Sequence, residues 1–340
     1  MSRVQRPSRT QRLNRRLLLL LILLMAATAY VGYHTLFEPL RQRTQVPPDG
    51  TGIPGVSDRE QEGPEETEAD RAAAAAEAAR LAHLERKPDF YTILVSGTDD
   101  GNGNSDTNIL VAVDTANDCI YGASIPRDSK AVINGKSRKI NYAFGSGGME
   151  LMSEVVSEQL GIPIDYTVLV DLRGFEALVD AIGGVTFNVP INMDYEDPYQ
   201  DLYIHIPQGV RKLNGSDALK VVRFREGYAS QDIGRMETQQ NFLKAVAKQM
   251  LRVENLTRID TFVKIFESYV DTDLTVNNLA WLGKEAIGMG AEAVSFSTLP
   301  GEWHSPYIYL DQAAVLELIN QHLNPYVEDR VAEDLQIPTR

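Results

Sequence analysis

Residues 90–124 read FYTILVSGTDDGNGNSDTNILVAVDTANDCIYGAS, and their pattern sets the expected fold. Apolar runs of strand length alternate here with loops rich in Gly, Asn and Asp, the usual signature of strands joined by turns. The three runs are Phe90–Ser96, Asn108–Asp114 and Cys119–Ser124. Since the runs are nearly continuous in apolar residues, they predict strands buried within a sheet.

The short connection between the last two runs predicts a hairpin. If Asp114 pairs with Cys119, the register carried outward sets Asp106 opposite Arg127. Asp99 and Asp106 lie in a Gly/Asn-rich loop after a buried strand, which is the end of an open α/β sheet where ligands usually bind. Turn chemistry alone also explains aspartates in such a loop. The register favours a meeting of carboxylates and cations at one end of the sheet.

Helices and strands alternate after this hairpin. Apolar spacing predicts helices over 148–160 and 173–182 and strands over 166–170 and 185–189. Residues 192–215 are acidic and aromatic and predict a long excursion. The expected fold is α/β, with a mixed central β-sheet and helices on both faces.

The stretch VVRFREGYASQDIGRMETQQ, residues 221–240, carries more cations than folding requires. A strand over its first five residues would project Arg223 and Arg225 from one side. In the helix that follows from Asp232, Arg235 and Gln239 fall inside the apolar arc. A single arginine is ordinarily a surface residue or a structural ion-pair partner. Several cations so close together favour a multiply charged anion, because buried cations need a partner and arginines match phosphate geometry.

Charge and hydropathy divide the chain. The formal charge is −14, yet six arginines precede the first acid. The rest of the chain is therefore strongly acidic and is not expected to bind nucleic acid. Residues 17–37 lack charge and are long enough to cross a bilayer, with the basic side in the cytoplasm. A cleavable signal peptide is the alternative. We therefore expect a cytoplasmic tail at residues 1–16, a transmembrane helix at 17–37 and an extracytoplasmic spacer or stalk at 38–88. A catalytic domain at 89–326 and a free C-terminal tail at 327–340 would follow.

The residues required by several other types of site are absent from the sequence. Cys119 is the only cysteine, so an internal disulfide is impossible and the zinc spacings do not occur. None of the five histidines belongs to a metal-ligand pair or lies near a Gly-x-Ser-x-Gly elbow. The chain also lacks a Gly-x-x-x-x-Gly-Lys-Ser/Thr loop, which argues against a nucleotide-driven reaction.

An ordered series of blocks resembles the LytR-CpsA-Psr family, most strongly from Phe90 to Gln249. The blocks are ILVSGTDDGNGNSDTNILVAVD, SIPRDS, KINYAFGSGGMELM, GIPIDYTVLVDLRGFEALVDAIGGVTFNVP, DPYQDLYIHIPQG, LNGSDALKVVRFRE and DIGRMETQQNFLKAV. The resemblance implies an Mg²⁺-dependent phosphotransferase that moves an anionic glycopolymer from an undecaprenyl-pyrophosphate carrier onto peptidoglycan. The product would be a phosphodiester on a muramic acid hydroxyl, and an apolar cavity would hold the polyprenyl chain.

The resemblance also implies roles for individual residues. Asp99 and Asp106 would hold the metal, and the pyrophosphate clamp would comprise Arg127, Lys139, Arg223, Arg225, Arg235 and Gln239. Arg127, Asp128, Arg223 and Arg225 would take part in catalysis. The loop after Asp99 is short and lacks the arginine often found there, which makes Asp99 the less secure ligand. Asp128 fits three roles, as a metal ligand, an orienter of Arg127 or a base.

Two other functions remain open from the sequence. Hydrolysis of the same lipid pyrophosphate would use water as the acceptor, and a non-catalytic envelope protein would hold the lipid-linked precursor for a partner or act as a regulator. A protein that only binds needs the arginines but not a metal-binding carboxylate pair, so retention of both favours catalysis. The expected location is the cell membrane, crossed once, with the domain outside. The residues do not identify the polymer, whether teichoic acid, capsule or another glycan.

Overall fold

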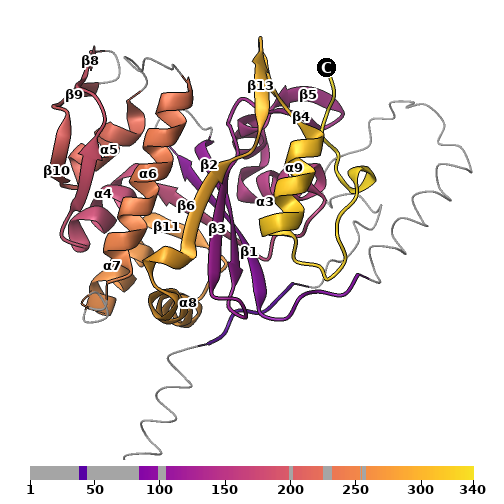
Figure 1. Cartoon of the computed structure of the whole chain (residues 1–340), viewed down its shortest axis with the longest axis horizontal. Helices are drawn as coiled ribbons and strands as arrows, with labels where there is room; N and C mark the ends of the chain where they lie inside the picture. The colour runs from indigo at the N-terminus through magenta and orange to yellow at the C-terminus, as the bar shows by residue number, and fades with distance from the viewer. Residues whose placement is uncertain are drawn as a thin grey trace, which may run out of the picture.

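A computed structural model of the chain describes residues 38–43, 84–98, 105–198, 202–224, 232–252, 254 and 258–340. Its centre is a six-stranded sheet in the order β11-β6-β1-β2-β3-β12 (Figure 1). The strands are β1 (Phe90–Thr98), β2 (Ser105–Asp114), β3 (Cys119–Ser124), β6 (Tyr166–Asp171), β11 (Val270–Thr272) and β12 (Val294–Thr298). β6 is parallel to β1 and β12 to β3, whereas the other pairs are antiparallel. The predicted mixed sheet is confirmed.

The β2–β3 hairpin has the predicted register. Asp114 pairs with Cys119, and the ladder continues to the pair Ile109 and Ser124. Beyond the ladder, the Ile125 N–H donates to the Asn108 carbonyl at 2.8 Å. Cys119 is the first residue of β3, as predicted, and partial burial raises the pKa of its thiol. The hairpin therefore carries the loop after β3 to the end of the sheet where β2 begins.

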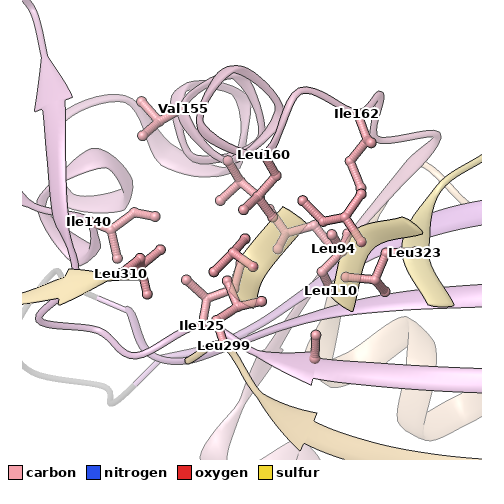
Figure 2. Packing of buried hydrophobic residues seen from close by; sticks show 14 of the residues in the cluster. Leu94, Leu110, Ile125, Ile140, Val155, Leu160, Ile162, Leu299, Leu310 and Leu323 are labelled. Atoms are coloured by element: carbon pink, nitrogen blue, oxygen red, sulfur yellow. The ribbon is translucent and has the colours of Figure 1, made fainter. Parts of the chain in front are cut away.

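Both faces of the sheet are covered by helices. One face packs Leu94, Leu110 and Ala123 against α3 (Asn141–Leu160), α9 (Gln312–Leu318) and the π-helical turn Ile319–Leu323 (Figure 2). The opposite face packs Ile93 and Val113 against α8 (Val276–Met289). Successive strand residues point to opposite faces, so the continuous apolar runs supply both layers.

Helix α3 starts earlier than predicted. It begins at Asn141 instead of Gly148, and Gly147 and Gly148 form a kink inside it. Gly161 ends it in the left-handed conformation with φ 65°, where a Cβ would lie 2.3 Å from the Asp334 carbonyl oxygen. The predicted stop at Gly161 is thus confirmed, and only glycine fits there.

A second cluster surrounds Phe242, which is fully buried. Its elements are α4 (Leu172–Ala181), β7 (Val185–Val189), β8 (Met193–Asp197), β9 (Leu202–Ile206), β10 (Gly209–Leu213), α5 (Gly215–Arg223), α6 (Asp232–Met250) and α7 (Ile259–Tyr269). Much of the predicted excursion is ordered, because β8 pairs with β9 and β10 pairs with β7. Figure 1 shows α4, α5 and α6 on the side of the sheet opposite α3 and α9.

The strand predicted over residues 221–225 is wrong. The Asn214 side chain accepts from the Asp217 N–H and caps α5, whose Ala218 and Val221 are buried one turn apart. The β-branched pair at 221–222 favours a strand locally, but packing of this face decides for a helix. Arg223 consequently ends a helix, where its charge complements the helix dipole.

The predicted domain start at residue 89 is too late. Residues 38–43 pack onto the sheet through Leu40, which is 4% exposed beside Tyr91 and Tyr166. The Gln42 Nε2 donates to the Lys87 carbonyl at 2.6 Å, so the two described ends of the predicted spacer meet. Within the described part of the chain, no helix is long and apolar enough to span a membrane. The predicted transmembrane segment, residues 17–37, lies outside that part.

The C-terminal residues are packed, so the predicted free tail is also wrong. Arg330 Nε lies 3.1 Å from Asp334 Oδ2, and both side chains are buried. Leu335 and Ile337 join the large core cluster. The Lys130 Nζ then donates to the Thr339 carbonyl at 2.7 Å. The segment therefore belongs to the folded domain.

Ionisation of Tyr91 lowers the stability of the fold at alkaline pH. Its burial, together with the Asp89 carboxylate, raises the pKa of Tyr91 to about 12 from its ordinary value of 10.0. The stabilising contribution is complete below about pH 10 and is lost as the pH rises toward 12. Between pH 9 and pH 11 the wild type should lose about 1 kcal/mol more unfolding free energy than Tyr91→Phe, as measured by urea denaturation. Parallel losses in the two proteins would contradict this.

Candidate active site

Several strands end at one edge of the sheet. Thr98, the last residue of β1, pairs with Asp171, the last residue of β6. Ser124 ends β3 and pairs with Thr298, which ends β12. β2 begins at the same edge, because Ser105 pairs with Thr98. The carboxyl ends of these strands form the position at which α/β sheets bind ligands.

Asp106 lies in an irregularity of β2 at this edge. Gly97 pairs with Thr107 and Thr98 with Ser105, so Asp106 is the extra residue of a β-bulge. Bulges are common beside active sites, where they redirect the chain. The Asp106 side chain and all of Asp99 lie outside the described structure. Among the side chains that are described, no group of three His, Cys, Asp or Glu is placed to hold a metal ion.

Asp128 is the centre of a charged cluster just after β3. The hairpin of β4 (Lys130–Ile133) and β5 (Lys136–Lys139) folds Lys139 back, and its Nζ lies 2.8 Å from Asp128 Oδ1. Arg127 Nε lies 3.9 Å from the other carboxylate oxygen. All three side chains are partly exposed to solvent. The arrangement sets two cations at the sheet edge with one carboxylate between them.

Helix α6 connects the end of α5 to the same edge. The Gln239 Nε2 donates to the Val222 carbonyl at 3.2 Å, beside Arg223. The neighbouring Gln240 Nε2 donates to Thr298 Oγ1, also at 3.2 Å. Gln240 therefore joins α6 to the end of β12, and Gln239 joins α6 to the last turn of α5, which ends at Arg223. Arg127 and Asp128 lie just after β3, and Lys139 ends β5. Arg225 lies outside the described residues, as does the side chain of Arg235.

Trp303, which was not among the residues predicted from the sequence, also lies beside this cluster. The hairpin of β13 (Gly301–His304) and β14 (Tyr307–Leu310) contacts it, because the Ile308 N–H donates to the Asp128 carbonyl at 2.8 Å. The Trp303 ring centre lies 5.9 Å from Lys139 Nζ. The aromatic segment GEWHSPYIYL was the available signal, but nothing local connects it to the loop after β3.

A separate cleft of about 310 Å³ lies beside β9 and β10. His205, Arg211, Lys212 and Asp217 are among its lining residues, and none of the predicted site residues takes part. His205 Nδ1 lies 2.5 Å from Asp194 Oδ1 and Nε2 lies 3.3 Å from Glu196 Oε1, so both ring nitrogens are engaged. This cleft is distinct from the charged cluster at the sheet edge.

Comparison with known proteins agrees with this architecture. The model of the LytR_cpsA_psr family matches residues 57–327. The chain belongs to this family. The resemblance inferred from the sequence blocks is confirmed.

Two relatives from this family are teichoic acid transferases by name. Polyisoprenyl-teichoic acid--peptidoglycan teichoic acid transferase TagU of Bacillus cereus is 32% identical over 245 residues, which cover 69% of this chain and 78% of TagU. The corresponding transferase TagV of Bacillus subtilis is 28% identical over 260 residues, covering 72% of this chain and 66% of TagV. The chain thus spans just under two thirds of the length of TagV.

Solved structures share the fold. The crystal structure of B. subtilis TagV matches with a TM-score of 0.60 at 27% identity. The match covers 71% of this chain and 100% of the TagV chain. A structure of TagT bound to LI-WTA has a TM-score of 0.58 at 25% identity, covering 70% of this chain and 91% of TagT. The LytR_cpsA_psr fold accounts for the central sheet and the helical layers described above.

Proposed function

We propose that this protein is a phosphotransferase that moves an anionic glycopolymer from an undecaprenyl-pyrophosphate carrier to peptidoglycan. The reaction would form a phosphodiester on a muramic acid hydroxyl and release the lipid phosphate. The cluster of Arg127, Asp128 and Lys139 at the sheet edge is the observation that carries the proposal. The names of the relatives, which act between teichoic acid and peptidoglycan, support this assignment.

Each described residue has a role in this reaction. The cations of Arg127, Lys139 and Arg223 bind the pyrophosphate and stabilise the charge that grows on the leaving lipid phosphate. Asp128 holds Lys139 at 2.8 Å and thereby fixes the position of the ammonium group. Because its carboxylate is already paired, we assign Asp128 to orientation and not to metal binding. Gln239, inside α6, donates to the Val222 carbonyl and so joins α6 to the last turn of α5.

The residues at the start of β2 fit Mg²⁺. Thr98, which precedes Asp99 in the sequence, pairs with Ser105, and the bulge sets Asp106 apart from the regular ladder. Mg²⁺ prefers one or two protein carboxylates together with phosphate oxygens of the substrate. Asp99 and Asp106 would hold the ion, with Asp106 as the principal ligand. The ion would neutralise charge on the phosphate oxygens.

We further propose a single membrane anchor at residues 17–37, with the N-terminus in the cytoplasm and the domain outside. Segment 38–43, which follows this anchor, packs beside Lys87 and Phe90 at the start of β1. The charged cluster lies beyond the other end of β1, after Thr98. A strand of this length spans about 25–30 Å, so the active site faces away from the point where the chain leaves the membrane.

The metal role is tested by Asp106→Asn, with Asp118→Asn at the opposite end of the hairpin as the matched control. Transfer from a lipid-pyrophosphate donor to peptidoglycan oligomers is measured across a Mg²⁺ titration. We expect Asp106→Asn and chelated wild type to lose about 100-fold or more in rate, and the control to respond to Mg²⁺ like the wild type.

Three outcomes would contradict parts of the proposal. Full activity in chelator would remove the metal from the mechanism. Release of the lipid phosphate without attachment to peptidoglycan would identify a hydrolase. Donor binding without turnover under any metal condition would identify a non-catalytic protein that binds the lipid-linked precursor.

A further inference from the structure

The β13–β14 hairpin exposes an indole beside the charged cluster. All four residues of β13 are exposed, and Trp303 retains 53% of its accessible surface. The strand projects from the top of the molecule in Figure 1. Large aromatic residues are the main contributors to binding at interfaces, so an exposed tryptophan beside a charged cluster is a candidate binding residue.

The two faces of this hairpin have different surroundings. Trp303 pairs with Ile308 and Glu302 with Tyr309, so pairs alternate between the faces. Along the β14 edge, in the plane of the hairpin, the Ile308 N–H donates to the Asp128 carbonyl. On the other face, the C-terminal Arg340 lies 2.7 Å from Glu302 and also contacts His304. These contacts hold the pKa of the Glu302 carboxyl below its ordinary value, with the His304 hydrogen bond as the largest cause. The hairpin is therefore held along the β14 edge and on the face opposite Trp303, while the indole stays exposed.

Trp303 is one side chain away from the proposed phosphate site. The Lys139 ammonium lies 5.9 Å from the indole centre and 2.8 Å from Asp128, so a single cation contacts both. A ligand at the cluster that extends past Lys139 reaches the indole. Sugar rings suit this surface, because their C–H faces pack on an aromatic ring while their hydroxyls bond to charged groups nearby.

The position of the hairpin decides which ligand it meets. Segment 38–43 lies at the bottom of Figure 1, whereas β13 projects from the top. With the anchor proposed above, a membrane surface would meet the bottom and the cell wall would meet the top. We propose that Trp303 is a platform on which a sugar ring of the acceptor glycan strand packs, directing its hydroxyl toward the Asp128–Lys139 pair. The identity of the glycan as peptidoglycan rests on the proposed function.

Tryptophan fluorescence tests the platform without any turnover. The chain has two tryptophans, and Trp281 lies on α8 with its ring 5.8 Å from that of Tyr91. Trp281→Phe therefore leaves Trp303 as the only indole. We expect peptidoglycan glycan oligomers to change its emission in a saturable manner and to leave the emission of Trp303→Phe unchanged.

The other arms of this titration distinguish the possible ligands. A response to anionic phospholipid vesicles would show that the hairpin binds a membrane, and a response to the lipid-linked donor alone would assign Trp303 to the donor sugar. Either result, or no response to glycan oligomers in a folded Trp281→Phe protein, would overturn the proposal. Because this measurement needs no transfer, it remains informative if the proposed reaction is wrong.

Kinetics provide a second readout. Trp303→Ala should raise the KM for peptidoglycan oligomers roughly tenfold, the size of one lost aromatic contact, with little change in kcat or in the KM for the donor. Tyr203→Ala, an exposed aromatic on β9, is the matched control and should change none of these values. Partial recovery in Trp303→Tyr is expected. Equal loss in kcat and in both KM values would mean that the hairpin only supports the cluster.

Discussion

Arg223→Ala should slow the transfer reaction by about 100-fold or more, since it removes a cation that stabilises charge on the leaving phosphate. Arg223 is the last residue of α5, and the Gln239 side chain binds the neighbouring Val222 carbonyl. Loss of the favourable interaction of this cation with the helix C-terminus should lower the unfolding free energy by about 0.3–1 kcal/mol. Initial rates at saturating donor and Mg²⁺, together with thermal denaturation, measure the two effects.

Arg252→Ala provides the control for this variant. Arg252 is an exposed arginine whose Nε lies 3.1 Å from Glu254, so its removal changes the net charge equally. We expect wild-type transfer rates from it. If Arg223→Ala instead lowered the melting temperature markedly while its folded fraction retained full activity, Arg223 would be structural.

Asp165→Ala should have the largest effect on stability. The Asp165 carboxylate is fully buried and accepts from the Thr92 N–H at 2.9 Å, the Arg43 N–H at 2.9 Å and Arg86 at 2.8 Å. Truncation leaves the largely buried Arg86 charge unpaired, which costs about 3–5 kcal/mol in comparable sites. Urea denaturation measures this loss.

The double variant Arg86→Leu with Asp165→Ala isolates the charge effect. It removes both members of the pair, so it should recover part of the stability lost in Asp165→Ala. Segment 38–43 should also become sensitive to protease in the single variant, because Asp165 holds the Arg43 backbone. A loss below about 1 kcal/mol in Asp165→Ala would show that water replaces the carboxylate easily.

Local features of the sequence were sufficient to predict the β2–β3 hairpin and its register. The turn between β2 and β3 is short, so the pairing of Asp114 with Cys119 follows from turn geometry, and the rest of that register follows from the pairing. The stop of α3 at Gly161 was equally local, because a left-handed residue ends the helix there. The family blocks were recognisable for the same reason, since each is a continuous run of residues.

Contacts between distant segments decided the rest. Residues 221–223 favour a strand on their own, but burial of Val221 within the cluster around Phe242 makes them the last turn of α5. The predicted free tail instead packs Leu335 and Ile337 into the core. Such packing depends on surfaces that form only when the whole chain folds, and it overrides local propensity.

The sequence likewise predicted the residues of the candidate site but not their arrangement in space. The charged residues themselves were evident from the sequence, because cations close together need an anionic partner. Their arrangement was not, since Lys139 reaches Asp128 through the β4–β5 hairpin and Trp303 reaches Lys139 from far along the chain. The sequence by itself determined the chemistry of the groups and the register of the hairpin beside them. Only the tertiary structure decided which groups meet, because side-chain interactions act over a few ångströms and depend on distance in space rather than along the chain.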